Sequence, residues 1–145
     1  MTTIDQQTLF EARDGNWFRI PSIARTASGA LLAFCQHRKG GVGDFEHDSD
    51  MLLRRSTDNG KTWSPPQVLA SKPGIDIHTG PVVIDRQRGR VLKFCRYWPA
   101  ENGKQTVSAW PWPRMREAGY VDHVVISDDH GETWQAGGLA QAGTG

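Results

Sequence analysis

Two eight-residue segments of this chain share the pattern Ser-x-Asp-x-Gly-x-Thr-Trp, at residues 56–63 and 127–134. Asp-Asn-Gly and Asp-His-Gly are turn tripeptides, in which glycine takes a positive φ and the aspartate carboxylate accepts hydrogen bonds from backbone amides. The serine and threonine hydroxyls can join the two arms of the turn, and the tryptophan supplies a large apolar surface. The pattern therefore predicts two equivalent β-hairpins with a structural role. Their defining residues are Ser56, Asp58, Gly60, Trp63, Ser127, Asp129, Gly131 and Trp134.

The repetition extends beyond these octapeptides. A set of residues recurs sixty positions later, namely Pro21, Gly29, Leu32, Phe34 and Cys35 as Pro81, Gly89, Leu92, Phe94 and Cys95. We expect three short strands in each unit, at 21–24, 30–36 and 50–55 and again at 81–84, 91–96 and 121–126. Because such units need neighbours to bury their faces, the repeat predicts an all-β fold of the β-propeller type. One blade is expected at about 16–66 and a second at about 78–137.

Two blades form only an arc of a ring. Propellers close with four to eight blades, so two blades leave open edges. The small-residue segment 140–145 follows soon after the second hairpin. We therefore expect the rest of the propeller to come from sequence beyond the C-terminus of this chain.

The composition narrows the classes of partner. With 17 basic and 16 acidic residues, the chain gives no electrostatic reason to expect binding to nucleic acid or to an anionic membrane. No stretch has the length of a membrane span, and residues 1–6 lack the character of a signal peptide, which is compatible with a cytoplasmic protein. We expect Cys35 and Cys95 to be small buried side chains on equivalent strands rather than a disulfide.

Two arginines lie where strands are expected to begin or end. Arg19 stands between Phe18 and Ile20 at the start of the first strand, and Arg38 follows the second strand. Burying a guanidinium is unfavourable unless an anion meets it. The arginines are therefore candidates for binding an anionic ligand. A structural ion pair or a solvent-facing position on an edge strand is the alternative.

The loop at 39–50 is rich in glycine and carboxylates. Asp44 lies between a glycine and Phe45, so the backbone can present it and an aromatic ring can shield it, which suits a general acid. Asp48 and Asp50 run into the third strand and are candidates for turn or strand residues. A solvated acidic turn is one alternative. Another is a calcium site built from the three aspartates, although their spacing lacks the EF-hand pattern.

Taken in order, these motifs resemble the exo-sialidases of the bacterial neuraminidase type, a family of glycoside hydrolases. The resemblance is carried by Phe18-Arg19-Ile20-Pro21, by residues 31–34, by Arg38 and its aspartate-bearing loop, and by residues 52–55 before the first octapeptide. The octapeptides are similar to Asp boxes, which occur in unrelated propeller families and carry no catalytic information alone. The resemblance implies a six-bladed propeller, of which this chain supplies about two blades.

The resemblance also implies roles for single residues. Arg19 resembles the first member of an arginine triad that binds the substrate carboxylate, and Arg38 resembles the second. Asp44 resembles the acid/base aspartate, with Asp48 and Asp50 as the alternative assignments. The third arginine, a nucleophilic tyrosine and the glutamate that activates it are expected later than this chain extends.

These residue types suit sialic acid, whose anomeric carbon bears a carboxylate. Planar guanidinium groups match a carboxylate in shape and charge. A carboxylate nucleophile 4 Å away would be repelled by about 4 kcal/mol, which rationalises a neutral tyrosine. Asp44 would protonate the leaving oxygen and later deprotonate water. The resemblance therefore implies hydrolysis of terminal sialic acid from sialylated glycans with retention, and without a metal or organic cofactor.

Two rival functions are a non-catalytic Asp-box propeller that binds glycans or proteins, and a related hydrolase of another acidic sugar. A binding propeller has no need for Arg19, Arg38 and Asp44 to converge on one concave pocket, so their placement discriminates between binder and sialidase. Residues of the second unit could also reach the pocket or line a sugar subsite, with core packing or a hydrogen-bonded loop position as the alternative: His78, Trp98, Trp110 and Trp112.

Overall fold

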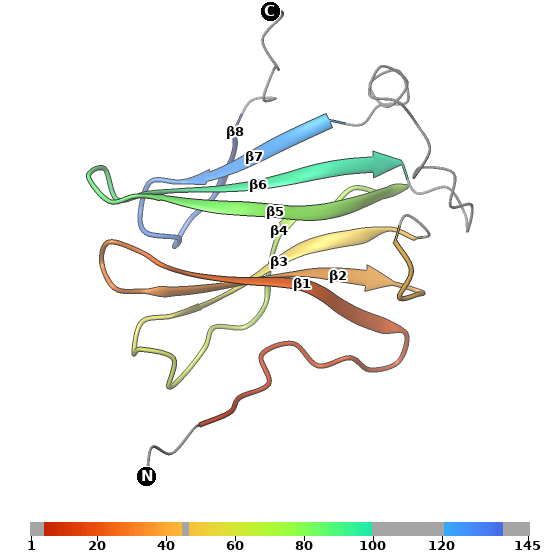
Figure 1. The fold of residues 1–145 in the computed structure, drawn as a ribbon, viewed down its shortest axis with the longest axis horizontal. Coiled ribbons are helices and arrows are strands. Elements are labelled where there is room, and N and C mark those ends of the chain that lie inside the picture. Colours follow the sequence, from red (N-terminus) through yellow and green to blue (C-terminus); the bar gives the residue numbers. More distant parts are fainter. Residues whose placement is uncertain (1–4, 45–46, 100–120, 138–145) are drawn as a thin grey trace, which may run out of the picture.

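The computed structural model of the chain describes residues 5–44, 47–99 and 121–137. All regular structure in these ranges is β-strand, arranged as two four-stranded antiparallel sheets (Figure 1). The first sheet contains β1 (Asn16–Arg25), β2 (Leu31–Lys39), β3 (Ser49–Ser56) and β4 (Gln67–Ala70). The second contains β5 (Ile75–Asp85), β6 (Arg90–Pro99), β7 (Val121–Ser127) and β8 (Gln135–Gly137). The prediction of an all-β fold is confirmed.

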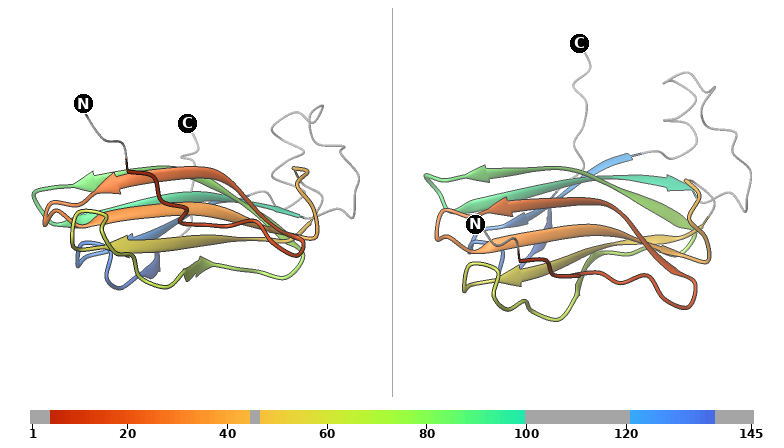
Figure 2. Two further views of the ribbon diagram at one scale, coloured as in Figure 1. Left: turned by 90° about the horizontal axis from the view of Figure 1, so that it is seen from below. Right: turned by 60° about the horizontal axis from the view of Figure 1, so that its bottom comes forward.

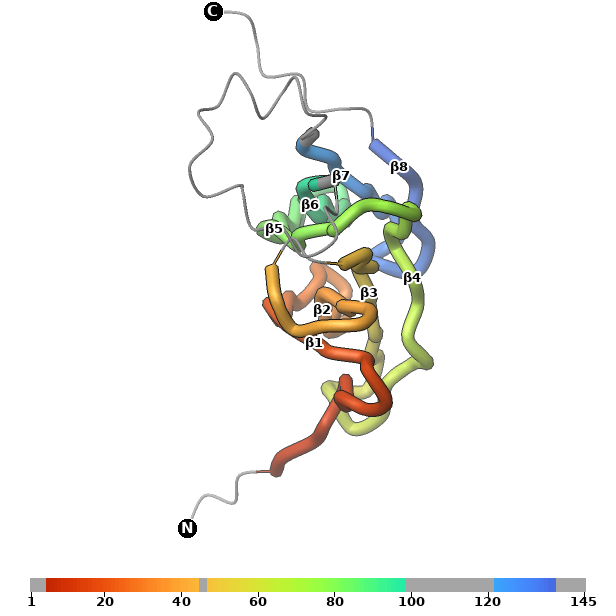
Figure 3. Tube along the Cα trace, turned by 90° about the vertical axis from the view of Figure 1, so that its right-hand side faces the viewer, coloured from red at the N-terminus to blue at the C-terminus, as the bar shows by residue number. Residues whose placement is uncertain are grey.

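Each sheet is a meander, because its strands lie in chain order. The first strands of the two sheets, β1 and β5, contact each other. Figures 2 and 3 show the sheets side by side with their strands running in similar directions, as in neighbouring propeller blades. The fourth strand of each sheet, β4 or β8, was not predicted. Within the described ranges, no helix is long and apolar enough to cross a membrane.

The hydrophobic core lies between the two sheets. Two clusters of buried side chains fill it, each with members from both sheets: Met51, Ala70, Ile77, Cys95 and Val125, and Leu32, Phe34, Leu53 and Val91. Burial of a leucine or phenylalanine side chain contributes about 1.5–3 kcal/mol, so this interface fixes one sheet on the other. Cys35 and Cys95 are buried free thiols at equivalent positions of β2 and β6, as predicted, and burial raises the pKa of each to about 11.

The two Asp boxes fold into nearly identical turns. In the first, Asp58 Oδ1 accepts hydrogen bonds from Ser56 Oγ at 2.8 Å and Thr62 N at 2.9 Å, and Gly60 N donates to Ser56 Oγ at 2.9 Å. The second box repeats these bonds at 2.7 to 2.9 Å, between Ser127, Asp129, Gly131 and Thr133. Hydrogen bonds from the threonine lower the pKa of each aspartate to about 2.

The tryptophans of the two boxes have different surroundings. Trp134 packs against both core clusters, and its ring makes an edge contact with Phe34 at 5.9 Å between centroids. Trp63 instead lies against the N-terminal segment, where its Nε1 donates to Gln7 Oε1 and to Gly60 O, each at 3.1 Å. Trp134 thus fastens the second sheet to the first.

Candidate functional site

The first strand is irregular next to its arginine. Pairing between β1 and β2 shifts between Arg19 and Ser22, and Ile20 has a φ of 53°. A β-branched residue rarely adopts this left-handed conformation, which costs about 1–3 kcal/mol and persists only where neighbouring structure enforces it. Ile20 O accepts a hydrogen bond from Thr79 Oγ1 of the second sheet at 3.2 Å. The backbone strain therefore lies beside Arg19, at the junction of the two sheets.

Arg38 is buried at the end of β2, with an exposure of 1%. Its Nε and Nη2 donate to Gln36 Oε1 at 3.1 and 3.0 Å, and Nη1 donates to Val42 O at 2.5 Å. Its Nη2 also pairs with Asp44 Oδ1. These four hydrogen bonds hold the guanidinium group in place and tie the loop after β2 to the sheet.

Arg19, Arg38 and Asp44 meet at this loop. Arg19 is exposed on β1, and its Nη1 donates to Val42 O at 3.3 Å, the carbonyl that also accepts from Arg38. Asp44 is partly exposed, with 45% of its side chain accessible to solvent. Phe45, which was expected to shield Asp44, lies outside the described residues. The three residues selected from the sequence are therefore brought together from β1, β2 and one loop.

The two alternative aspartates have other partners. Asp50 Oδ1 accepts a hydrogen bond from Lys39 Nζ at 2.8 Å, and its Oδ2 lies 3.5 Å from His37 Nδ1. Asp48 Oδ2 accepts from Gly74 N at 3.0 Å. In the described part of the chain, no three His, Cys, Asp or Glu residues gather as a metal site would require. Asp44, Asp48 and Asp50 are therefore each held by a different partner.

Sequence reasoning missed a buried polar network behind this site. Gln36, with an exposure of 0%, donates from Nε2 to Asp76 Oδ1 of the second sheet at 2.7 Å. Ser49 Oγ donates to the same oxygen at 2.5 Å, and His78 Nε2 lies 2.9 Å from Asp76 Oδ2. One signal was available: Gln36 directly continues the apolar run of β2, where a polar side chain needs a buried partner.

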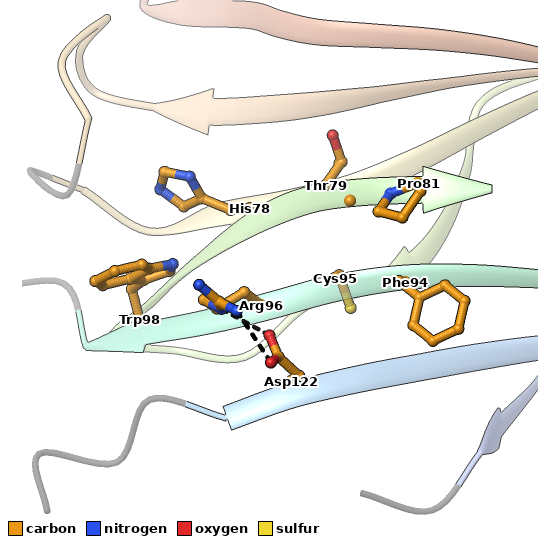
Figure 4. A pocket seen from close by; sticks show the side chains of 9 residues that line it. His78, Thr79, Pro81, Phe94, Cys95, Arg96, Trp98 and Asp122 are labelled. Atoms are coloured by element: carbon orange, nitrogen blue, oxygen red, sulfur yellow. Dashed lines mark hydrogen bonds and ion pairs between the residues drawn. The ribbon is translucent and has the colours of Figure 1, made fainter. Parts of the chain in front are cut away.

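A pocket of about 510 Å³ lies over the second sheet. Figure 4 shows His78, Arg96, Trp98 and Asp122 at one end of it, with Arg96 bound to Asp122 by two hydrogen bonds of 2.6 and 3.0 Å. Trp98 is buried, and its ring centroid lies 5.7 Å from that of His78. A sugar subsite at Trp98 stays a prediction. Trp110 and Trp112 lie outside the described residues.

Comparison with known proteins adds to this geometry. The BNR/Asp-box repeat family matches the chain at residues 54–65 and 125–136. The chain is 33% identical over 137 residues to the sialidase of Paraclostridium sordellii, covering 88% of this chain and 32% of that protein. It is 30% identical to the sialidase of Micromonospora viridifaciens, covering 81% of this chain and 18% of that protein. The chain therefore spans a third or less of these two relatives.

Comparison of the fold with solved structures gives the same group of proteins. The structure of the Hadza microbial sialidase Hz136 superposes with a TM-score of 0.69 at 26% identity, covering 81% of this chain and 25% of that one. The two sheets correspond to part of a β-propeller in that comparison. By its repeats, its relatives and its fold, the chain is similar to one part of the length of bacterial-type sialidases.

Proposed function

We propose that this chain provides part of the active site of an exo-α-sialidase, which releases terminal sialic acid from sialylated glycans with retention of configuration. The proposal is carried by the meeting of Arg19 and Arg38, from two strands, on the carbonyl of Val42 next to Asp44. Two guanidinium groups at one point attract an anionic sugar. The sialidase relatives support sialic acid as that sugar.

The two arginines contribute in different ways. Arg19 is exposed, so its guanidinium can exchange the contact with Val42 O for the substrate carboxylate without being desolvated first. Arg38 makes four hydrogen bonds within the protein and is buried. Arg19 therefore provides the direct bidentate contact, whereas Arg38 supplies positive potential and fixes the loop. This division refines the role that the family resemblance implies for Arg38.

Asp44 is the acid/base residue of the proposed reaction. Its Oδ1 is engaged by Arg38, and we assign the proton transfer to Oδ2. The carboxyl group gives its proton to the glycosidic oxygen as the bond to the anomeric carbon breaks, and later accepts a proton from the attacking water. The tyrosine nucleophile, its glutamate and the third arginine that the resemblance implies belong to other blades of the six-bladed ring.

The experiment follows hydrolysis of an α-sialoside by the full-length protein with proton NMR. Retention predicts that the α-anomer of sialic acid appears first and then mutarotates. Asp44→Asn is expected to lower kcat/KM on an alkyl sialoside by about 100-fold or more, the usual contribution of a general acid. Asp48→Asn is the matched control and is expected to change it little. Binding of sialosides without hydrolysis by the wild-type protein would overturn the proposal and indicate a binding propeller.

A further inference from the structure

We propose that Asp76 is a positioning residue for this active site, acting from the second sheet through Gln36 on Arg38. The inference rests on the function proposed above, because it concerns the same site. Asp76 lies in β5, whereas Gln36 and Arg38 lie in β2 of the other sheet. One side chain of the second sheet therefore controls the arrangement of the site in the first.

The residues form a continuous chain of hydrogen bonds. Asp76 Oδ1 accepts from Gln36 Nε2 at 2.7 Å, and Gln36 Oε1 accepts two bonds from Arg38 at 3.0 and 3.1 Å. Arg38 then pairs with Asp44 Oδ1. Asp76, Gln36 and Arg38 are each at most 1% exposed. Because solvent is excluded from these links, a lost bond is not replaced by water.

The orientation of the Gln36 amide is forced from both ends. An ionised carboxylate has only acceptors, so Asp76 selects the NH2 group of Gln36. A guanidinium has only donors, so Arg38 selects the carbonyl oxygen. The amide thus joins the buried carboxylate of Asp76 to the buried guanidinium of Arg38 in one orientation. If Asp76 lost this role, the NH2 end of the amide would keep only its bond to Ser49 Oγ at 3.1 Å, and Gln36 would hold Arg38 less firmly.

Asp76 is itself firmly held. Ser49 Oγ donates to Oδ1 at 2.5 Å, and the amide of Ile77 donates to Ser49 Oγ at 2.6 Å. His78 Nε2 lies 2.9 Å from Oδ2. Both carboxylate oxygens therefore have partners that prevent rotation. Such anchoring is what a residue needs in order to fix the geometry of another.

The network is not a general feature of these sheets. Sixty positions away, the residues equivalent to Asp76 and Gln36 are Asn16 and Arg96. Asn16 Oδ1 contacts His37 Nε2 at 2.7 Å, and Arg96 pairs with Asp122. The repeat thus preserves the strands but not this chain of bonds. The residue types that make this network therefore occur once in the two repeat units, at the junction where the network reaches Arg38 and Asp44.

The test moves the negative charge of the network from position 76 to position 36 in the full-length protein. Gln36→Glu places two buried carboxylates against each other and breaks the link. Adding Asp76→Asn restores it, because the introduced amide donates to the new carboxylate at position 36 while that carboxylate accepts from Arg38. Gln67→Glu, the same substitution at an exposed position of β4, is the control. All variants are compared at a temperature at which denaturant unfolding shows each to be fully folded.

Activity is measured on two α-sialosides. An aryl group leaves without protonation, whereas an alkyl group needs the general acid, so misplacement of Asp44 is seen mainly with the alkyl substrate. Gln36→Glu is expected to lower kcat/KM at least tenfold on the alkyl sialoside and much less on the aryl one, and the double variant to return within about threefold of wild type. If Gln36→Glu does not fold, Gln36→Met carries the same comparison of substrates.

Three results would overturn the inference: equal losses on both substrates, a Gln36→Glu variant as active as Gln67→Glu, or no recovery in the double variant. Asp44→Asn, measured in parallel, distinguishes a failure of the inference about Asp76 from a failure of the proposed function. If Asp44→Asn loses activity selectively on the alkyl sialoside while Gln36→Glu does not, the sialidase assignment stands and the role of Asp76 falls.

Discussion

Lys93 in β6 provides a sharp prediction about the interface between the sheets. Its side chain is 0% exposed, and its Nζ donates to Ser22 Oγ at 3.1 Å and Gly80 O at 2.5 Å. The ammonium also lies 4.8 Å from the centroid of the Phe34 ring. These partners are all uncharged. Burial therefore lowers the pKa of Lys93 from 10.5 to about 8.

The size of this shift sets the expected effect. Because burial lowers the pKa of Lys93 from 10.5 to about 8, and one pKa unit corresponds to about 1.4 kcal/mol, the charged form destabilises the folded state by about 3 kcal/mol at pH 7. Lys93→Met keeps most of the stem and removes this penalty, but it leaves Gly80 O and Ser22 Oγ without their donor, which costs about 2 kcal/mol. We expect the variant to be more stable than wild type by about 1 kcal/mol at pH 7.

The pH dependence of stability tests the direction of this effect independently. Between pH 8 and 10.5 the unfolded protein keeps the lysine proton while the folded protein loses it, so the stability of wild type rises with pH relative to the variant. By pH 10.5 the order of the two proteins should have reversed. Deprotonation of the buried Cys35 thiol affects both proteins alike. Lys93 lowers the pKa of the Cys95 thiol, so its removal makes ionisation of Cys95 cost the variant more at high pH, which acts in the same direction as the reversal.

The assay is urea unfolding of the full-length protein at several pH values, followed by tryptophan fluorescence. Lys61→Met, in the exposed turn of the first Asp box, is the control and should give a difference that is independent of pH. If the difference between wild type and Lys93→Met stays constant from pH 7 to 10.5, Lys93 is not desolvated. The close packing of the two sheets around Lys93 would then be wrong.

Two further predictions concern the Asp boxes. Gly131 and Gly60 have similar φ values of 84° and 88°, but a Cβ on Gly131 would lie 2.6 Å from the buried Leu32 side chain, whereas one on Gly60 meets its nearest atom at 3.5 Å. Both Gly→Ala variants should lose about 1–2 kcal/mol to backbone strain, and Gly131→Ala a further 1–3 kcal/mol to overpacking, as measured by urea unfolding; equal losses would contradict this. The second prediction concerns acid unfolding. Hydrogen bonds lower the pKa of Asp129 to about 2 in the folded protein, compared with 3.8 in the unfolded one. The contribution of this carboxylate to folding stability is therefore complete above pH 3.8 and is lost as the pH drops toward 2. Thr133→Val should make the free energy of unfolding depend less on pH between 3.8 and 2. An unchanged pH dependence would argue against the hydrogen bonds from Thr133.

Local patterns predicted the fold because its main signals are local. The Asp-Gly turns place a positive φ at fixed positions, and the apolar runs of β2 and β6 fill the space between the sheets. The fourth strands escaped prediction because β4 has four residues and β8 three, and segments this short show no clear alternation of apolar and polar residues. Their place depends on pairing with β3 and β7, which a short segment does not encode alone.

The candidate site was predictable only in part. Arg19 and Arg38 stood out because a charged side chain beside an apolar strand needs an anion, and Asp44 followed from the glycine-rich loop. The link from Gln36 to Asp76 spans forty positions and joins two sheets, so it arises only from their packing. For the same reason, the sequence did not reveal that Arg38 uses four hydrogen bonds within the protein.

The most direct measurement is the effect of Asp44→Asn on two sialosides that differ only in their leaving group. If Asp44 donates the proton to the glycosidic oxygen, kcat/KM of the full-length protein should fall about 100-fold or more on the alkyl sialoside and far less on the aryl sialoside. An equal fall on both substrates, or unchanged hydrolysis of the alkyl sialoside, would contradict the assignment of Asp44 and with it the proposed active site.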